Sequence, residues 1–505
     1  MRRRAGRTGK DKSDEEMRED NLIIDCFAGG GGASVGIEMA VGRSVDIAVN
    51  HDPQAIRMHT VNHPKTLHLT EDIFEVDLQK YVGGRHVALM WASPDCTQFS
   101  KAKGGKPRVS GIRMLPWAVY KHAKAVRPDV IIMENVEEIQ QWGPLDESGR
   151  PIKEKMGEEY SRFISAVKGL GYAFDSRELI AADYGAPTTR KRWYAIFRRD
   201  GREIVWPEPT HFKGHDPRWL QCGNYIDWSD LGTSIFDRKK PLAEATQRRI
   251  ANGIKKYIIN NPHPYIVKNG DTIFASYLDK AYGGNYKGCG SDLRNPCSTI
   301  TTVDHNRLVT AFLIQYHGEQ KDGDSRGQVL TEPLRTIDTS NRYGLVTAFV
   351  TKFYKTGIGQ GCDEPLHTIT TSPGHFGVIS AFLVKYYGQG CGQQVSEPLA
   401  TITTKDRFGL VNVLLTIDGQ KYIISDIFLR MLKPKELKIM QGFPNDYIIG
   451  YDLSWRKMSV AEQVAKIGNS VSPPVAKALV EANCAYLKEG ERKPIISFDR
   501  LEKTG

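Results

Sequence analysis

Residues 22–36 read LIIDCFAGGGGASVG, an apolar run followed by four glycines and then a helical pattern. The apolar run predicts a strand over Leu22–Cys26, and the pattern after the glycines predicts a helix over Ala33–Ala40. Glycines between a strand and a helix let the backbone approach a ligand closely. Four glycines could equally form a plain tight turn, so the loop Phe27–Gly32 needs support from the rest of the chain.

The same alternation of strands and helices continues to about residue 206. Further strands are predicted at Val45–Val49, Val87–Ala92, Val130–Met133, Tyr172–Ala182 and Trp193–Arg198, with helices at Pro53–Asn62 and Met114–Val126. This order predicts βαβ units, and therefore an α/β domain with a mostly parallel, Rossmann-like sheet and helices on both faces.

Two more strand ends carry reactive side chains. Cys96 lies in SPDCTQFS, residues 93–100, just after one apolar strand, and Glu134 ends the next strand. Because the carboxyl ends of parallel strands meet at one edge of a sheet, the glycine loop, the thiol and the acid predict an enzyme site there. A thiolate can attack carbon, and a buried acid can share a proton. Taken singly, Cys96 could be a structural thiol and Glu134 a helix cap or a buried ion-pair partner.

Basic residues precede the strand Trp193–Arg198. In TTRKR, residues 188–192, the alternation of a strand places Arg190 and Arg192 on one face and Lys191 on the other. Two forked cations on one face suit a phosphate or a carbonyl oxygen, although a solvated basic edge would have the same pattern.

Polar residues after the second strand suggest contacts to a nucleoside. Asn50 and Asp52 stand where dinucleotide-type folds contact a ribose. Asp72 and Ile73 could reach an adenine amino group, although Asp72 could also be a turn or cap acid. No Gly-Lys-Ser/Thr sequence closes the glycine loop, which argues against a nucleoside triphosphate.

Composition bounds the class of protein. The 505 residues are 40% hydrophobic and 25% charged, which is ordinary for a globular protein, and the length predicts two or three domains. A net charge of +10 favours a polyanionic partner. No apolar stretch approaches the ~18 residues of a membrane span, and we expect no secretory signal. Eight cysteines without metal-type spacing predict free thiols in a reducing cytosol and no bound metal.

The middle of the chain contains an internal repeat. Its copies read NPCSTITT from residue 295, EPLRTIDT from 332, EPLHTITT from 364 and EPLATITT from 397. Each copy runs into a second β-type stretch, which predicts one hairpin-like unit per repeat. The predicted turns carry side chains suited to phosphates and base edges, namely Arg307, Arg342, His375, Lys405 and Arg407. A purely structural repeat that only stacks is the alternative.

Taken together, the motifs resemble those of the C5-cytosine DNA methyltransferase family. The resemblance rests on FAGGGG (27–32), PDC and FS (94–96 and 99–100), ENV (134–136), the T-x-R-x-R pattern (188–192), QGFP (441–444) and GNSV (468–471). These occur in family order over about residues 22–485, apart from a variable middle. Asp95 replaces a second proline, Asn50 the usual ribose-binding acid and Thr188 a glutamine. None of these departures removes a group that makes or breaks a bond.

The resemblance implies a cofactor, a substrate and residue roles. The implied cofactor is S-adenosylmethionine, with S-adenosylhomocysteine as product and no metal, and the implied substrate is a cytosine flipped out of duplex DNA. Cys96 would add to carbon 6 of the ring, Glu134 would hydrogen-bond N3, and Arg192 would contact the flipped nucleotide with Arg190 in support. Cofactor contacts are implied for Phe27, Ala28, Gly29, Gly31, Gly32, Asn50, His51, Asp52, Asp72, Ile73, Pro94, Asn469, Ser470 and Val471. DNA contacts are expected for Ser100 and Lys101 and for the five repeat residues named above.

The family layout also predicts the domain order. We expect a disordered charged tail over 1–20, the first part of the catalytic domain over 21–206, a β-rich target-recognition domain over 207–426, completion of the catalytic domain over 427–487, and a tail over 488–505. We further expect a cytoplasmic monomer, bacterial or phage-encoded, whose activity needs no cognate restriction endonuclease.

Two rival readings stay open at this point. An RNA cytosine-5 methyltransferase would use the same chemistry, but the long repetitive middle suits the reading of a duplex. A catalytically inactive, sequence-specific DNA-binding protein would not need the intact set of Cys96, Glu134 and Arg192.

Overall fold

The computed structural model describes residues 21–95, 114–236, 238–240, 242–269, 272–281, 288–315 and 420–488, with six short strands between 349 and 417. The chain divides into two compact units. Unit 1 contains residues 1–228, 293–306 and 431–505, and unit 2 contains residues 229–292 and 307–430.

Unit 1 is built on a seven-stranded sheet with the order β3-β2-β1-β4-β5-β7-β6. The strands are β1 (Leu22–Cys26), β2 (Ile47–Val49), β3 (Leu67–Leu69), β4 (Val87–Ala92), β5 (Val130–Asn135), β6 (Ala173–Ile180) and β7 (Lys191–Arg198). Strands β1 to β5 pair in parallel, and β7 is antiparallel to both β5 and β6. The predicted α/β class and mostly parallel, Rossmann-like sheet are confirmed.

The strand order reverses at β1. Its parallel neighbours are β2 on one side and β4 on the other. In open α/β sheets, ligands bind in the crevice outside the carboxyl ends of the strands at such a switch point. The glycine loop follows β1, and the segment leading to Cys96 follows β4, so both predicted motifs begin at this crevice.

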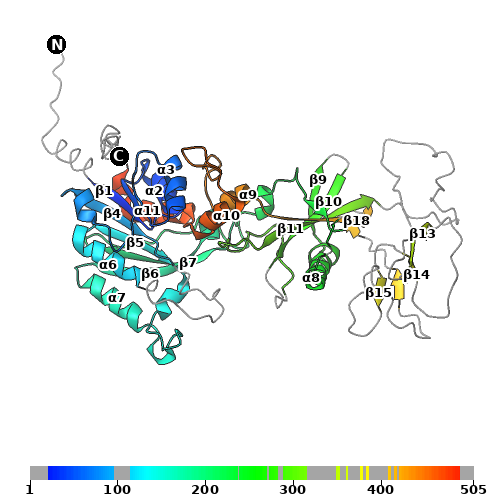
Figure 1. Cartoon of the computed structure of the whole chain (residues 1–505), viewed down its shortest axis with the longest axis horizontal. Coiled ribbons are helices and arrows are strands. Elements are labelled where there is room, and N and C mark those ends of the chain that lie inside the picture. The colour runs from blue at the N-terminus through cyan, green and yellow to red at the C-terminus, as the bar shows by residue number, and fades with distance from the viewer. Residues whose placement is uncertain are drawn as a thin grey trace, which may run out of the picture. The chain divides into compact units, whose positions relative to one another are not determined.

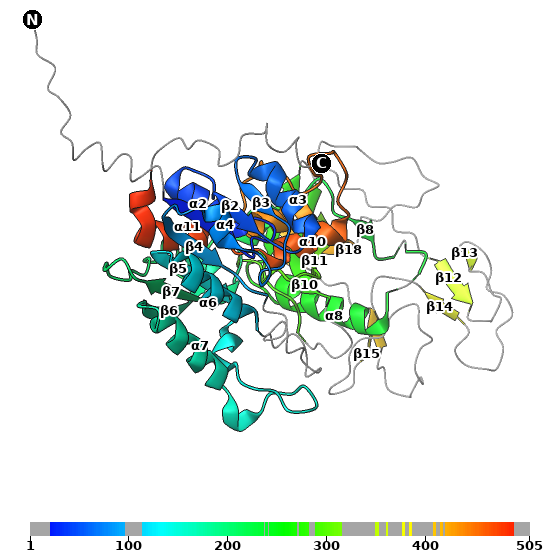
Figure 2. The same cartoon turned by 60° about the vertical axis from the view of Figure 1, so that its left-hand side comes forward.

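Helices cover both faces of this sheet (Figures 1 and 2). The helices of unit 1 are α2 (Gly32–Val41), α3 (Pro53–Asn62), α4 (Leu78–Val82), α6 (Leu115–Val126), α7 (Glu158–Lys168), α9 (Pro434–Met440), α10 (Val460–Asn469) and α11 (Pro473–Cys484), with short 3₁₀ turns at Glu137–Gln141, Lys153–Lys155, Ala181–Tyr184, Cys222–Tyr225 and Ala485–Leu487. On β1, Ile23 enters the core shared with α2 and α11, whereas Ile24 enters the core shared with α6 and α7. The two helices α2 and α11 pack so tightly that a Cβ added to Gly36 would lie 2.5 Å from that of Ala476.

Unit 2 contains a six-stranded sheet with a helix packed on it. The strands are β8 (Thr233–Ser234), β9 (Tyr265–Asn269), β10 (Thr272–Lys280), β11 (Asn306–Gln315), β17 (Leu415–Ile417) and β18 (Gln420–Met431), in the order β17-β18-β11-β10-β9 with β8 beside β18. Helix α8 (Glu244–Ile254) and the π-helical turn Lys255–Ile259 supply apolar side chains to its core. The Tyr277 hydroxyl on β10 donates to the Ile250 carbonyl of α8 at 3.0 Å. Smaller sheets are formed by β12 (Phe349–Lys352), β13 (Gln360–Gly361) and β14 (Phe376–Val378), and by β15 (Leu383–Lys385) and β16 (Phe408–Leu410).

The boundaries of unit 2 differ from those predicted for the recognition domain, residues 207–426. Residues 207–228 and 293–306 belong to unit 1. The reason is backbone pairing: Cys297 exchanges hydrogen bonds with Thr189 and Pro187 (2.8 and 2.9 Å), and Cys222 donates to Asn295 at 3.1 Å. The first repeat copy is irregular over 295–302 and is followed by β11, so it is not a hairpin. The other three copies lie outside the described residues.

None of the helices in the described part of the chain has the length and apolar character that a membrane crossing requires.

Candidate active site

The glycine loop adopts a backbone that few side chains tolerate. Phe27, Gly29 and Gly31 have φ angles of 66°, 52° and 88°, all in the left-handed region. Ala28 N–H donates to the Val49 carbonyl at 3.0 Å, which ties the loop to the end of β2. The loop therefore presents mainly backbone to the crevice at the carboxyl end of β1, as expected for a ligand that the main chain approaches closely.

The far side of the glycine loop is braced by the C-terminal part of the chain. The Tyr447 hydroxyl donates to the Gly30 carbonyl at 2.8 Å, and a Cβ added to Gly31 would lie 2.1 Å from that hydroxyl. A Cβ on Gly32 would lie 2.1 Å from the Val471 carbonyl. Gln441 Nε2 donates to the Ser470 carbonyl at 2.7 Å and so fixes the segment that touches the loop.

The three predicted cofactor residues near the C-terminal end differ in whether they contact the glycine loop. Ser470 and Val471 are buried against the glycine loop, while Asn469 is exposed at the last position of α10. Sequence reasoning missed Tyr447, because it lies more than 400 residues from Gly30 and outside the quoted motifs. The only available signal was its position three residues after the QGFP motif.

A chain of buried polar groups runs beneath the loop. Ser34 Oγ donates to the Asp25 carboxylate, His59 Nε2 lies 2.9 Å from Ser34 Oγ, and His59 Nδ1 lies 2.8 Å from His68 Nε2. Asp25, Ser34 and His59 are each 0% exposed. Burial raises the pKa of Asp25 to about 7 and lowers the pKa of His68 to about 4. The network joins β1, α2, α3 and β3 under the predicted cofactor loop.

Asn50 and Asp52 are now distinguishable. Asp52 caps α3 by accepting from the Gln54 and Ala55 N–H groups, and its other oxygen binds Lys466 Nζ. Burial favours the neutral acid, but the Lys466 contact and the hydrogen bonds from Gln54 and Ala55 together outweigh burial and lower the pKa of Asp52. Asn50 uses only Oδ1, which accepts from Asp52 N–H at 2.8 Å. Within the described residues, the Asp52 carboxylate is therefore more heavily engaged than the Asn50 amide, and His51 is exposed between them.

The turn containing Asp72 and Ile73 is held by α6. Asp72 Oδ1 accepts from Phe74 N–H at 2.8 Å, so one carboxylate oxygen closes the turn. His122 Nε2 bonds the Ile73 carbonyl at 2.7 Å, and Lys121 Nζ reaches the carbonyls of Phe74 and Val76. Neither Lys121 nor His122 was identified from the sequence, because a polar pair on a helix carries no motif.

The segment leading to Cys96 is anchored at two points. Ser93 N–H donates to the Cys26 carbonyl at 3.3 Å, and Asn135 Nδ2 donates to the Pro94 carbonyl at 3.0 Å. These bonds fix the chain two residues before Cys96. Cys96 itself, with Ser100 and Lys101, lies outside the described residues. Cys26 is close to the loop, but burial raises the pKa of its thiol, so it is a poor rival nucleophile.

Glu134 and the two predicted arginines come together at the end of β5. Glu134 Oε1 lies 3.3 Å from Arg192 Nε and 3.5 Å from Arg190 Nη2. Glu134 and Arg190 are buried, and Arg190 Nη1 also donates to the Gly468 carbonyl at 3.0 Å. Lys191 points to the other face and pairs with Glu137 and Glu178, each at 2.6 Å. The alternation expected for residues 190–192 is observed.

Arg307 does not occupy the expected turn. It lies on β11 in unit 2, where its guanidinium pairs with the fully buried Asp279, which also binds Arg249. A buried carboxylate requires positively charged partners, so neutralising Asp279 explains why an arginine stands at position 307 without any contact to DNA. The other predicted repeat residues, Arg342, His375, Lys405 and Arg407, lie outside the described residues.

The donor set of the crevice fits an adenosyl ligand. The glycine loop offers backbone, Asn50 offers an amide, and Asp72 offers an acceptor for an amino group, all at the carboxyl edge of the sheet. Within the described residues, no three His, Cys, Asp or Glu side chains are grouped as metal ligands.

Comparison with known proteins identifies a sequence family and similar individual proteins. The sequence model described as C-5 cytosine-specific DNA methylase matches residues 22–484. The Type II methyltransferase M.AquIA of Picosynechococcus sp. is 29% identical over 253 residues, which span 48% of this chain and 99% of that protein. The Type II methyltransferase M1.HphI of Haemophilus parahaemolyticus is 29% identical over 274 residues, 49% of this chain and 70% of that protein. Among solved structures, the S. pombe Dnmt2 methyltransferase is 13% identical with a TM-score of 0.41, covering 91% of this chain and 97% of its own.

Proposed function

The chain belongs to the C-5 cytosine-specific DNA methylase family and is a DNA (cytosine-5)-methyltransferase, and on that premise we propose that it methylates a cytosine flipped out of duplex DNA through a covalent bond to Cys96. The proposed methyl donor is S-adenosylmethionine, which supplies an electrophilic methyl group when bound. The proposed cofactor contacts are the glycine loop, Asn50 and the Asp72–Ile73 turn.

The arrangement at the ends of β4 and β5 carries this proposal. Glu134 is buried with Oε1 facing two guanidinium groups, and the next residue, Asn135, holds the Pro94 carbonyl just before Cys96. The thiol and the acid lie at or after the ends of neighbouring strands. This spacing suits a pyrimidine ring in which the thiol attacks carbon 6 while the acid contacts N3.

The proposed steps assign one task to each side chain. The Cys96 thiolate adds to carbon 6, and Glu134 hydrogen-bonds N3, where negative charge develops. Carbon 5 gains enamine character and takes the methyl group, while the bond between that methyl and sulfur breaks and S-adenosylhomocysteine leaves with the electron pair. Loss of the carbon 5 proton then expels the Cys96 sulfur from carbon 6 and restores the ring. Arg192 is proposed to contact the flipped nucleotide, and Arg190 to hold Glu134 and the end of α10 in place.

We propose that unit 2 recognises the target sequence, that the enzyme acts as a monomer, and that it needs no endonuclease partner. The basic charge of the chain, +10 overall, supports a polyanionic substrate. The set of DNA-reading side chains excludes Arg307, because the Asp279 pair uses its guanidinium.

The decisive experiment replaces the nucleophile. Purified Cys96→Ser protein should bind cofactor and duplex DNA but transfer no labelled methyl group to DNA. Cys289→Ser is the matched control, because Cys289 is a partly exposed free thiol of unit 2 with no proposed role. Turnover by the Cys96→Ser protein would contradict the assignment.

A trapping experiment tests the covalent step independently. With fluorine at carbon 5 of the target cytosine, no proton can be lost there, so the wild-type protein should remain bonded to DNA under denaturing conditions. Parallel assays on duplex DNA and transfer RNA test the rival substrate. Methyl transfer to RNA alone would overturn the choice of DNA.

A further inference from the structure

The loop between α9 and α10 and the first residue of α10 expose large apolar side chains that the proposed chemistry does not use. Leu453, Trp455 and Val460 are 62%, 75% and 63% exposed. The Trp455 ring stacks on Tyr451, with ring centroids 4.7 Å apart and an angle of 19° between the rings. The stacked Tyr451 and Trp455 rings form a continuous apolar surface next to the exposed Leu453, and such a surface is typical of an interaction site.

The same loop is internally fixed. Asp452 Oδ1 accepts hydrogen bonds from Ser454 N–H, Ser454 Oγ and Arg456 N–H at 3.0, 2.7 and 3.0 Å. Trp455 has a φ of 58°, a left-handed conformation that costs free energy in a bulky residue. The hydrogen bonds to Asp452 hold Trp455 in that conformation. As a result, the Trp455 indole ring is exposed to solvent in a defined position.

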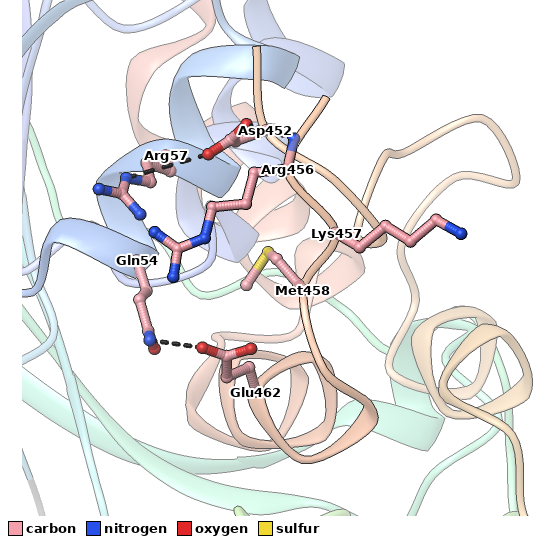
Figure 3. Close-up of a pocket in the computed structure, with 7 residues that line it drawn as sticks. All are labelled: Gln54, Arg57, Asp452, Arg456, Lys457, Met458 and Glu462. Atoms are coloured by element: carbon pink, nitrogen blue, oxygen red, sulfur yellow. Dashed lines mark hydrogen bonds and ion pairs between the residues drawn. The ribbon is translucent and has the colours of Figure 1, made fainter. Parts of the chain in front are cut away.

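Basic side chains line a pocket at the base of this loop (Figure 3). Gln54 and Arg57 come from α3, and Asp452, Arg456, Lys457, Met458 and Glu462 come from the loop and the start of α10. The guanidinium groups of Arg57 and Arg456 lie on the same side as the Gln54 amide, whereas Lys457 extends away from them.

The carboxylates of the pocket are already committed to local structure. Glu462 accepts from Ser459 N–H at 2.6 Å and from Gln54 Nε2. Asp452 closes the loop and reaches Arg57 Nε only at 4.0 Å. Two guanidinium groups therefore share one side of the pocket with two carboxylates that they face without a close contact: among these described residues the one ion pair, Arg57 with Asp452, is 4.0 Å long. A planar fork of donors is suited to phosphate oxygens.

The pocket lies at the functional edge of the sheet. Gln54 and Arg57 are in the first turns of α3, which directly follows the carboxyl end of β2. The glycine loop and Glu134 follow or end strands at the same edge.

We propose that residues 450–458 and Arg57 form a second DNA contact of unit 1, at which Arg57 and Arg456 bind a backbone phosphate and Trp455 packs against the adjoining nucleotide. This contact rests on the proposed function, because it takes duplex DNA as the substrate. Cations beside an exposed aromatic ring suit a nucleic acid, in which phosphates alternate with flat apolar surfaces.

The test measures binding of the full-length protein to a labelled 30-base-pair duplex of arbitrary sequence, over a series of salt concentrations. Phosphate contacts are independent of sequence, so the target site is not required. The double variant Arg57→Gln/Arg456→Gln should bind about threefold to tenfold more weakly, and the slope of log affinity against log salt should fall by about one. Trp455→Ala should weaken binding without changing the slope. Cofactor affinity should be unchanged in both.

The matched control is Lys168→Gln, because Lys168 is exposed in the last turn of α7, which leads to the amino end of β6. It should bind DNA like the wild type. Should the double variant melt at a lower temperature, Arg456→Lys replaces it: the charge and slope are kept, and affinity falls because the fork is lost.

Wild-type slope and affinity in the arginine and tryptophan variants would overturn the proposal and assign the surface to another class of partner. Methyl transfer to duplex DNA by the wild-type preparation separates the two hypotheses. Its absence would contradict the proposed function, whereas its presence with unaltered variant binding would contradict only the second contact.

Discussion

The Ser34 hydroxyl donates a 2.6 Å hydrogen bond to the Asp25 carboxylate, directly beneath the glycine loop. Because both side chains are fully buried, neither can exchange this partner for water. The bond extends through His59 to His68, so the start of α2 is coupled to α3 and β3. The position of the loop therefore depends on its neighbours Asp25 and Ser34 and also on His59 and His68, which lie outside every motif quoted above.

Replacing Ser34 by Ala should weaken both the fold and cofactor binding. The change removes a partner from buried Asp25 and His59, so we expect the free energy of unfolding to fall by about 1–3 kcal/mol. Urea denaturation and calorimetric titration with S-adenosylhomocysteine measure the two effects. Ser161→Ala, on the exposed face of α7, should change neither. If Ser34→Ala binds the cofactor with unaltered affinity, the buried network does not control cofactor binding by the glycine loop.

Asp25→Asn should change how stability depends on pH. Burial raises the pKa of Asp25 from 3.8 to about 7, so the folded chain holds an extra proton between these values and stability falls as pH rises. Burial lowers the pKa of His68 from 6.5 to about 4, so there the unfolded chain holds the extra proton and stability rises with pH. The two contributions oppose each other in the wild type. In Asp25→Asn, melting temperature should rise more steeply from pH 5 to pH 7, and a parallel profile would contradict the Asp25 assignment.

Gly31→Ala should be far more damaging than Gly83→Ala. Both glycines have positive φ, 88° and 61°, so each alanine pays for backbone strain. Only at Gly31 would the new Cβ also meet another group, the Tyr447 hydroxyl at 2.1 Å, whereas Gly83 faces open space. We expect Gly31→Ala to lose cofactor binding in equilibrium dialysis. Equal effects of the two substitutions would show that packing on Tyr447 is unimportant.

Glu134→Gln should lower kcat by about 10²–10⁴-fold while DNA and cofactor still bind. The amide keeps the shape of the side chain and still lies opposite Arg190 and Arg192, but it cannot transfer a proton to N3. Single-turnover methyl transfer is the appropriate measurement. Turnover within a few-fold of wild type would exclude Glu134 as the group at N3.

Asn135→Ala should impair the chemical step without touching a reacting atom. Asn135 positions the Pro94 carbonyl, and the change frees the segment that carries Cys96. Misplacing a nucleophile by about 1 Å can cost about 10²-fold in rate. The fluorocytosine adduct should form correspondingly slowly, with cofactor affinity retained. Adduct formation at the wild-type rate would refute this positioning role.

Several features could be predicted because they depend on local pattern. The parallel strands, the glycine loop and the opposite faces of Arg190 and Lys191 follow from apolar runs, glycine content and strand alternation. Strands β2 and β6 are shorter than predicted, and β3, α4 and α7 were not assigned, because their patterns are short or mixed. The placement of residues 293–306 in unit 1 was missed, because it depends on pairing with residues 187–189 far away in the chain.

The amino-acid sequence alone determined which chemical groups follow which strands, because strand ends and turn glycines are encoded within about ten neighbouring residues. Tertiary structure decided how those groups are used. It showed that Asp52 is taken by a helix cap and Lys466, that Arg307 is taken by Asp279, and that Tyr447 supports the glycine loop. The pairings with Lys466, Asp279 and Tyr447 each join segments separated by tens to hundreds of residues, and packing in three dimensions selects them where local pattern carries no signal.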